Sequence, residues 1–182
     1  GFGRTGAWFA CEHSGVVPDL ICLGKALTGG FPLSACVGRA GLMVAAWPPS
    51  NGEAIHTSTF LGHPVGCAMA LAHIEEIRAK RLVERSARLG QWLLSQLSEV
   101  QSPQSKVVCR ARGSGLMAGL EILIRGKPAS ELALRSIKEM HQQGFILLPE
   151  GEYSNVISFT PPFVITEAQL AMAVRRLAAV LS

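Results

Sequence analysis

Lys25 has the surroundings that most favour covalent chemistry. It follows the apolar run Leu20–Leu23 and is flanked by Gly24 and Ala26, where a lysine has no evident ionic partner. An amine held in a medium of low dielectric constant loses its proton more readily and becomes a nucleophile. The sequence therefore predicts one of two states for Lys25: a reactive amine, or a lysine whose stem packs at the strand end while its ammonium group reaches water.

Two glycine-containing segments have the spacing of nucleotide-binding motifs but lack the required context. Gly1–Gly6 matches G-x-G-x-x-G, yet no strand precedes it in this chain and Ala7–Ser14 is too short for a crossover helix. Around Lys25, Asp19 stands where a P-loop needs glycine and Ala26 stands where Ser or Thr would hold magnesium. Neither segment indicates a dinucleotide or a nucleoside triphosphate site.

The cysteines and histidines do not have the spacing of a metal site. Cys11 lies close to His13, and His56 lies seven residues before His63, but neither spacing is that of a zinc site. The five cysteines form no C-x-x-C pair and lie mostly in apolar runs. This pattern favours buried, reduced thiols in a cytoplasmic protein over a disulfide framework, and we expect no bound metal.

An α/β scaffold is expected to position Lys25 and the residues that follow it. The runs Leu20–Leu23 and Leu33–Val37 are largely apolar rather than alternating, which predicts strands covered on both faces. Pro64 opens a helical pattern, because proline is tolerated in the first turn of a helix. One face of a second helix is marked by Leu82, Leu89, Leu93 and Leu97.

A different pattern follows the polar segment 101–105. Hydrophobic periodicity predicts a strand, a helix and two further strands over Leu116–Arg125, Ala129–Gln143, Phe145–Leu148 and Asn155–Phe159. Thr166 and Gln169 have the spacing of a capping box at the start of a final helix. Residues 101–182 are therefore expected to form a small α+β domain.

The overall composition is that of a packed globular protein. Of the 182 residues, 48% are hydrophobic and 16% are charged, which is too apolar for a disordered chain. The net charge of +4 comes from scattered basic residues with a single Tyr beside them, which argues against a nucleic-acid partner. The apolar runs are far shorter than the roughly 18 residues that cross a bilayer, so we expect no membrane span.

Three segments stand in the order and spacing of one known enzyme family, and two later segments are similar to its C-terminal domain. The five segments are Gly1–Gly6, Pro18–Leu33, His56–Phe60 with Pro64, Arg112–Met117 with Gly119–Glu121, and Pro161–Thr166. Together they resemble the class III aminotransferases, which are pyridoxal-phosphate enzymes of fold type I. The resemblance implies part of the α/β large domain over 1–80, a linking helix over 81–100 and the small α+β C-terminal domain over 101–182.

The resemblance also implies roles for four residues. Lys25 corresponds to the lysine that is joined covalently to pyridoxal phosphate. Thr59 corresponds to a threonine whose hydroxyl reaches the cofactor phosphate from the neighbouring subunit, and Phe60 offers a backbone amide beside it. Ser58 matches a position that touches phosphate or substrate in some members, although Ser58 and Thr59 also suit a capped turn before the Pro64 helix. A site shared between subunits implies a homodimer.

The activity implied is transfer of an amino group from an amino acid or ω-amino acid, of the 4-aminobutyrate or acetylornithine type, to a 2-oxo acid such as 2-oxoglutarate. Family members are more than twice as long as this chain. The residues that stack on the cofactor ring and pair with its nitrogen are expected before Gly1. The chain therefore resembles the C-terminal half of an enzyme, and by itself it is expected to be inactive.

Ser158 limits the choice of substrate. It stands where the acetylornithine and ornithine branch is expected to carry an arginine for the α-carboxylate, and a hydroxyl cannot replace a bidentate guanidinium. An ω-amino acid or 4-aminobutyrate is therefore favoured, with Arg110, Arg112 or an upstream arginine able to compensate. Two alternatives stay open: an aminomutase or decarboxylase of the same fold, and a non-catalytic dimerisation module.

Overall fold

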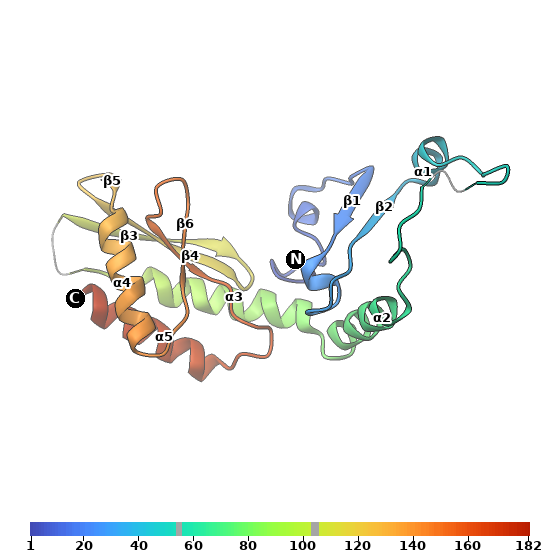
Figure 1. The fold of residues 1–182 in the computed structure, drawn as a ribbon. Helices are drawn as coiled ribbons and strands as arrows, with labels where there is room; N and C mark the ends of the chain where they lie inside the picture. The colour runs from blue at the N-terminus through green and yellow to red at the C-terminus, as the bar shows by residue number, and fades with distance from the viewer. Residues whose placement is uncertain (54–55, 103–105) are drawn as a thin grey trace. The chain divides into compact units, whose positions relative to one another are not determined.

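In the computed structural model, which describes residues 1–53, 56–102 and 106–182, the chain divides into two units (Figure 1). The first consists of Gly1–Gly3 with Ala7–Leu82, and the second of Arg4–Gly6 with Val83–Ser182. The three-part division expected from the sequence stays a prediction.

The first unit is built around a short antiparallel pair of strands. Its order is η1 (Ala10–Ser14), β1 (Leu20–Leu23), η2 (Lys25–Leu27), β2 (Ala35–Gly38), α1 (Ala40–Ala46) and α2 (Pro64–Ala79). Both predicted strands are present, but Leu20 and Val37 are 50% and 55% exposed, so the expectation of a sheet covered on both faces is wrong for this chain. The physical reason is that a two-stranded sheet leaves most of its surface without a packing partner.

Helix α2 begins at Pro64, as the sequence predicts. Its N-cap is His63, whose Nδ1 accepts a hydrogen bond from the Gly66 backbone N–H at 3.3 Å. The turn that Ser58 and Thr59 suit is present, since the Leu61 N–H donates to the Ser58 carbonyl, but the side chain that caps α2 is the His63 imidazole. The short helix α1 was not predicted, because its apolar residues have no polar face to set a helical period.

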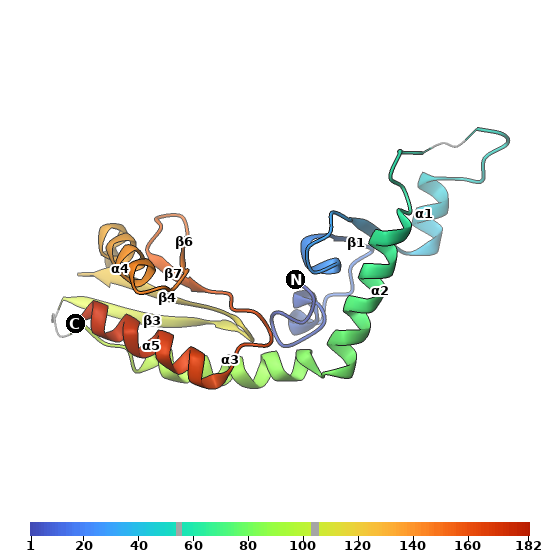
Figure 2. The same ribbon diagram turned by 60° about the horizontal axis from the view of Figure 1, so that its bottom comes forward.

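The second unit is an antiparallel sheet with helices packed on one face. Its strands run in the order β3–β4–β7–β6, and β5 pairs with β4. The strands are β3 (Val107–Ser114), β4 (Met117–Ile124), β5 (Lys127–Pro128), β6 (Leu148–Glu150) and β7 (Val156–Phe159). The helices are α3 (Leu82–Ser98), α4 (Ser130–Gln142) and α5 (Glu167–Leu181). Figure 2 shows α3 and α5 running along one side of the strands.

One hydrophobic core joins these helices to the sheet. It combines Leu93 of α3, Met140 of α4 and Leu177 of α5 with Leu120 and Ile157 of the sheet, all of them fully buried. The leucine face predicted for α3 is confirmed for Leu89, Leu93 and Leu97, which lie in this core. Burial of this apolar surface is the main source of stability for the unit.

Two strands of the second unit differ from the sequence prediction. Strand β3 was missed, although its core-facing Val107 and Cys109 are buried, because basic residues and Gly113 interrupt the run. The strand expected over Phe145–Leu148 is wrong, since β6 starts at Leu148. Gly144 has a φ of 85°, and the Phe145 and Leu147 side chains pack against the core in the connection that follows α4.

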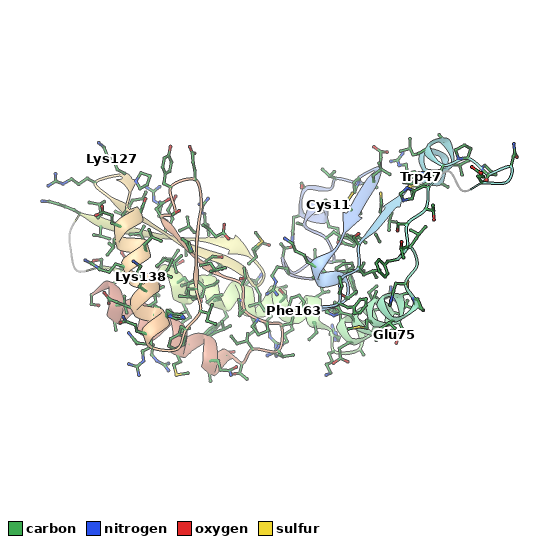
Figure 3. The ribbon with its side chains drawn as sticks, viewed as in Figure 1. Cys11, Trp47, Glu75, Lys127, Lys138 and Phe163 are labelled. Carbon is green, nitrogen blue, oxygen red and sulfur yellow. The ribbon has the colours of Figure 1, made fainter. Side chains whose placement is uncertain are left out.

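The glycine-rich N-terminal segment is part of the packing of the second unit. The Arg4 carbonyl accepts hydrogen bonds from the Leu116 N–H at 2.9 Å and from the Ser86 hydroxyl at 2.8 Å. The Arg4 guanidinium donates to the Leu116 and Pro161 carbonyls and lies 4.6 Å from the centre of the ring of Phe163, the residue labelled in Figure 3. Desolvation lowers the pKa of Arg4. Arg4 therefore holds the N-terminal segment against the second unit.

Arg85 holds the same connection from helix α3. Its Nε donates to the Phe163 carbonyl at 2.9 Å and its Nη2 donates to the Ile165 carbonyl at 2.6 Å. Two arginines thus bind the backbone that leaves β7, and charged donors make the stronger kind of hydrogen bond. This connection follows Ser158, so the two arginines also fix the end of the strand on which Ser158 lies.

The thiols are more exposed than the sequence predicts. Cys109 is buried, and burial raises the pKa of its thiol. Cys11 is half-buried, whereas Cys22, Cys36 and Cys67 are exposed, so the expectation of mostly buried thiols is wrong for this chain. The apolar neighbours in the sequence belong to short strands and to α2, which present these cysteines outward.

Replacing Thr166 with Ala is expected to destabilise the second unit by about 1 kcal/mol. The Thr166 hydroxyl accepts from the Gln169 N–H at 3.2 Å, and the Gln169 side chain accepts from the Thr166 N–H at 2.9 Å. The predicted capping box is therefore confirmed. Urea denaturation followed by circular dichroism measures the loss. The exposed Thr160 is the control, and an equal loss in Thr160→Ala would remove the capping explanation.

Candidate active site

Lys25 occupies an unusual backbone conformation directly after β1. Its φ is 44°, in the left-handed region that residues other than glycine rarely adopt. Such conformations persist where the surrounding structure imposes them, and they are enriched at active sites. The preceding Gly24 is extended, with a φ of −169°, so the chain turns sharply at the lysine itself.

The Lys25 side chain is exposed, and its amine is available for chemistry. Among the residues that the structure describes, no hydrogen bond or ion pair engages this amine. The expectation of a low-dielectric environment is therefore not met by this chain alone. A primary amine that is unpaired and fixed at a strand end nevertheless suits covalent bonding to an aldehyde.

Residues just after Lys25 anchor its turn. Leu27 and Thr28 are buried, and the Thr28 hydroxyl donates to the Phe31 carbonyl at 2.5 Å. Gly29 has a φ of 72°, and a Cβ atom there would lie 2.7 Å from Nδ1 of His73 in α2. The approach of Gly29 to His73 was not predicted, because the two residues lie far apart in the chain.

Replacing Gly29 with Ala is expected to destabilise the Lys25 turn by about 2 kcal/mol, since the new Cβ meets His73 and the backbone has positive φ. Gly30→Ala is the matched control, because Gly30 also has a positive φ, 149°, but has open space around it. Thermal unfolding is the measurement. Adding His73→Ala should recover stability in Gly29→Ala and not in Gly30→Ala; equal recovery in both would contradict the steric explanation.

The second candidate segment, Ser58–Phe60, lies just before helix α2. Ser58, Thr59 and Phe60 are all exposed, in two successive turns closed by hydrogen bonds from Leu61 N–H to the Ser58 carbonyl and from His63 N–H to the Phe60 carbonyl, each 3.2 Å. In the described part of the chain, no hydrogen bond joins Lys25 to Ser58 or Thr59. Their side chains therefore remain available to other groups.

His63 connects this segment to the Lys25 loop. Its ring lies 6.2 Å from the Phe60 ring and 5.4 Å from the Phe31 ring, measured between centroids. Aromatic rings at such distances attract each other. His63 thus helps to position Phe60 beside the Lys25 loop. The sequence analysis mentions His63 only for its spacing from His56, which does not suit a zinc site. Among the described residues, no group of three His, Cys, Asp or Glu side chains could hold a metal ion.

A third group of residues lies on the sheet face of the second unit opposite the core. Arg112, Gly119 and Ser158 are paired in one register row across β3, β4 and β7. They line a hollow of about 360 Å³ together with Met117, Glu150 and Thr160. Gly119 has no side chain of its own, and the Val156 side chain lies against it, with Cγ1 2.7 Å from where a Cβ atom would stand. Arg112 also lies 3.8 Å from the Glu121 carboxylate.

The family is decided by comparison with known proteins. Residues 1–181 match the family model for class III aminotransferases. This chain belongs to that family. A 5-aminovalerate aminotransferase of Pseudomonas aeruginosa is 40% identical over 173 residues, which cover 93% of this chain and 39% of that protein. An ornithine aminotransferase of Bacillus cereus is 38% identical over 183 residues, which cover all of this chain and 42% of that protein.

Solved structures agree with this assignment. A Bacillus anthracis aminotransferase superposes with a TM-score of 0.87 at 29% identity, over 100% of this chain and 42% of that one. An acetylornithine aminotransferase from Elizabethkingia anophelis superposes with a TM-score of 0.82 at 33% identity, over 100% and 45%. The α/β fold type I expected from the resemblance is confirmed. The chain spans about two fifths of the length of these relatives.

Class III aminotransferases use pyridoxal phosphate as a family, and two observations on this chain fit that group. The Lys25 amine is exposed and unpaired among the described residues, on a backbone of positive φ. The exposed Thr59 offers a hydroxyl, and the two backbone hydrogen bonds that close the turns of this segment do not use it. An amine for the aldehyde and a donor for the phosphate are the groups that such a cofactor requires.

Proposed function

We propose that the full-length protein containing this chain transfers an amino group from an ω-amino acid to a 2-oxo acid such as 2-oxoglutarate, with pyridoxal phosphate bound to Lys25. The observation that carries the proposal is the Lys25 amine, unpaired and fixed by a left-handed backbone after β1 in a class III aminotransferase chain. When bound, pyridoxal phosphate supplies an electron sink for the substrate carbon that bears the amine.

Lys25 has two tasks in this proposal. Its Nζ would hold the cofactor covalently. When free, the same amine would take up and give back a proton at the substrate carbon that bears the amino group. The anchored turn at Leu27 and Thr28 supports this role, because a base must stay within reach of that carbon.

Ser58, Thr59 and Phe60 are proposed to complete the site of a second subunit. The Thr59 hydroxyl and the Phe60 N–H would donate to the cofactor phosphate, and Ser58 would contact phosphate or substrate. Phe60 and Leu61 are 73% and 64% exposed, and adjacent exposed apolar side chains are typical of a surface that another chain covers. We propose a homodimer on this basis. No helix in the described residues could cross a membrane, and a cytoplasmic location stays a proposal.

The substrate proposal depends on Ser158 and Arg112. A hydroxyl at position 158 cannot clamp an α-carboxylate in the way that a guanidinium does. Arg112 shares the register row of Ser158 and lines the same hollow, so we propose that it binds the carboxylate of an ω-amino acid. The relatives named for 5-aminovalerate and 4-aminobutyrate support this substrate class.

The test is product analysis with the full-length protein loaded with pyridoxal phosphate. Each of 5-aminovalerate, 4-aminobutyrate, ornithine and acetylornithine is supplied with 2-oxoglutarate, and glutamate is measured. Glutamate is expected, and faster from the ω-amino acids than from acetylornithine. An isomerised donor or released carbon dioxide without glutamate would indicate the aminomutase or decarboxylase alternative. No cofactor absorbance on titration with pyridoxal phosphate would indicate a dimerisation module. The 182-residue chain alone is expected to be inactive.

A further inference from the structure

The Arg4 side chain joins two neighbouring strands of the second unit at one end of the sheet. Its Nη1 donates to the Leu116 carbonyl at 3.2 Å and to the Pro161 carbonyl. Leu116 directly precedes β4, and Pro161 follows the end of β7 by two residues. Strands β4 and β7 are neighbours in the sheet, and Arg4 belongs to the same unit. Arg4 therefore bridges the start of one strand and the end of the other.

The register of β4 and β7 shows which contact this bridge replaces. The Ile122 N–H donates to the Asn155 carbonyl at 2.8 Å, which marks the two residues as a hydrogen-bonded pair. Such pairs recur at every second position along an antiparallel ladder. When the register of β4 and β7 is continued beyond the last paired residues, Leu116 and Pro161 stand at a position of the hydrogen-bonded kind.

Leu116 and Pro161 cannot exchange the two backbone hydrogen bonds of such a pair. Proline has no N–H to donate. The Leu116 N–H donates instead to the Arg4 carbonyl at 2.9 Å and to the Ser86 hydroxyl at 3.1 Å. Both carbonyls of the pair would thus lack their ladder donors, and the Arg4 guanidinium donates to both. A charged donor makes the stronger kind of hydrogen bond, so Arg4 closes the strand pair where the backbone cannot.

The strands closed in this way carry the hollow proposed to bind the substrate. Gly119 of β4 pairs with Ser158 of β7, three positions from Leu116 and Pro161, and Arg112 of β3 lies in the same row. The hollow of about 360 Å³ extends across all three strands. Separation of β4 from β7 at this end would change the distance between the Arg112 guanidinium and the β7 side of the hollow. Binding by a fixed group is sensitive to displacements of about 1 Å.

We propose that Arg4 is a positioning residue for the amino donor, because it holds Leu116 and Pro161 together and so keeps Arg112 at the distance from β7 that suits the carboxylate of an ω-amino acid. This inference rests on the proposed function, in which Arg112 binds that carboxylate. Arg4 itself does not touch the substrate. Its effect passes through the backbone of β4 and β7, and it concerns binding of the donor rather than attachment of the cofactor to Lys25.

Arg85 provides a matched comparison for Arg4. It also donates two hydrogen bonds to backbone carbonyls of the connection that leaves β7, those of Phe163 and Ile165. Neither acceptor belongs to β4 or to the turn before it. Loss of either guanidinium removes two charged hydrogen bonds, but only the loss of Arg4 opens the pair of β4 and β7. A purely structural role predicts the same result for both arginines.

Steady-state kinetics of the full-length protein loaded with pyridoxal phosphate test the inference. Arg4→Met and Arg85→Met keep an unbranched apolar stem but lose every donor. With 5-aminovalerate and 2-oxoglutarate, Arg4→Met is expected to raise the KM for 5-aminovalerate about tenfold or more, with little change in kcat and with the absorbance of lysine-bound cofactor retained. Arg85→Met should raise this KM much less, although both variants should unfold at lower urea concentrations.

Arg4→Lys and Arg85→Lys form a milder pair that gives the same comparison if a Met variant does not fold. The ammonium group keeps a donor but lacks the planar fork, so Arg4→Lys should again have the higher KM.

The outcomes separate this inference from the proposed function. If the wild-type protein forms glutamate and the Arg4 and Arg85 variants have equal KM values, the inference is overturned and the proposed function stands. Loss of the cofactor absorbance in Arg4→Lys would also overturn it, because a residue that positions only the donor leaves the cofactor in place. If the wild-type protein forms no glutamate, the proposed function fails and this inference fails with it.

Discussion

Replacing Lys25 with Ala is expected to abolish the absorbance of lysine-bound cofactor and to reduce amino transfer by about 10²–10⁴-fold or more in the full-length protein. Two losses combine in this variant. The cofactor would lose its covalent attachment, and the base that would move a proton at the substrate carbon is removed. Absorbance spectra after dialysis against pyridoxal phosphate and single-turnover glutamate formation measure the two losses separately.

Two further variants make this result specific. Lys25→Arg keeps a positive charge at the end of β1 but cannot form the covalent bond, so it should lose the absorbance as Lys25→Ala does. The exposed Lys138 lies on α4 and is labelled in Figure 3, and Lys138→Ala should retain both absorbance and turnover. If Lys25→Ala keeps the absorbance and its rate, Lys25 is not the cofactor lysine and the proposed function loses its main support.

The sequence predicts the elements that carry a clear period or an explicit cap. The start of helix α2 was predicted from Pro64, and the start of α5 from the capping box of Thr166 and Gln169, because each start carries an explicit local signal. Strand β3 and helix α1 were missed for opposite reasons. Basic residues and glycine hide the alternation of β3, whereas α1 has too little polar surface to show a period.

Within the candidate site, local motifs identify the chemistry but not its supports. Lys25 stood out because the residues around it in the sequence leave a lysine without an ionic partner. His63 and His73 support the Lys25 loop through contacts that join segments far apart in the chain. No local pattern reports such contacts. The exposure of Lys25 agrees with one of the two states predicted for it. The exposure of Cys22, Cys36 and Cys67 was mispredicted, because an apolar neighbour in sequence does not guarantee a packing partner in space.

The glycines near the N-terminal segment show how close packing, rather than nucleotide binding, can require glycine. Gly90 lies in α3 and is buried, and a Cβ atom there would come within 2.1 Å of the Gly115 carbonyl oxygen. Gly115 has a φ of 54°, and its own added Cβ would lie 2.5 Å from the Thr5 carbonyl carbon. Three backbone segments therefore touch without side chains between them.

Gly90→Ala is consequently expected to destabilise the second unit strongly. The overlap is with backbone atoms that cannot rotate away, and overpacking of this kind costs about 3 kcal/mol or more. The higher helix propensity of Ala offsets about 1 kcal/mol of that loss. We therefore expect a net loss of about 2 kcal/mol or more in the free energy of unfolding, measured by urea denaturation.

Gly41→Ala provides the matched control for this loss. Gly41 lies in helix α1, and a Cβ atom there meets nothing within 4 Å, so the change adds a methyl group without an overlap. Its expected effect is a gain of up to about 1 kcal/mol, since Ala is the better helix former. If Gly90→Ala were as stable as Gly41→Ala, the approach of α3 to the Gly115 turn would have to be looser than the structure shows. The anchoring of Arg4 between that turn and α3 would then need another explanation.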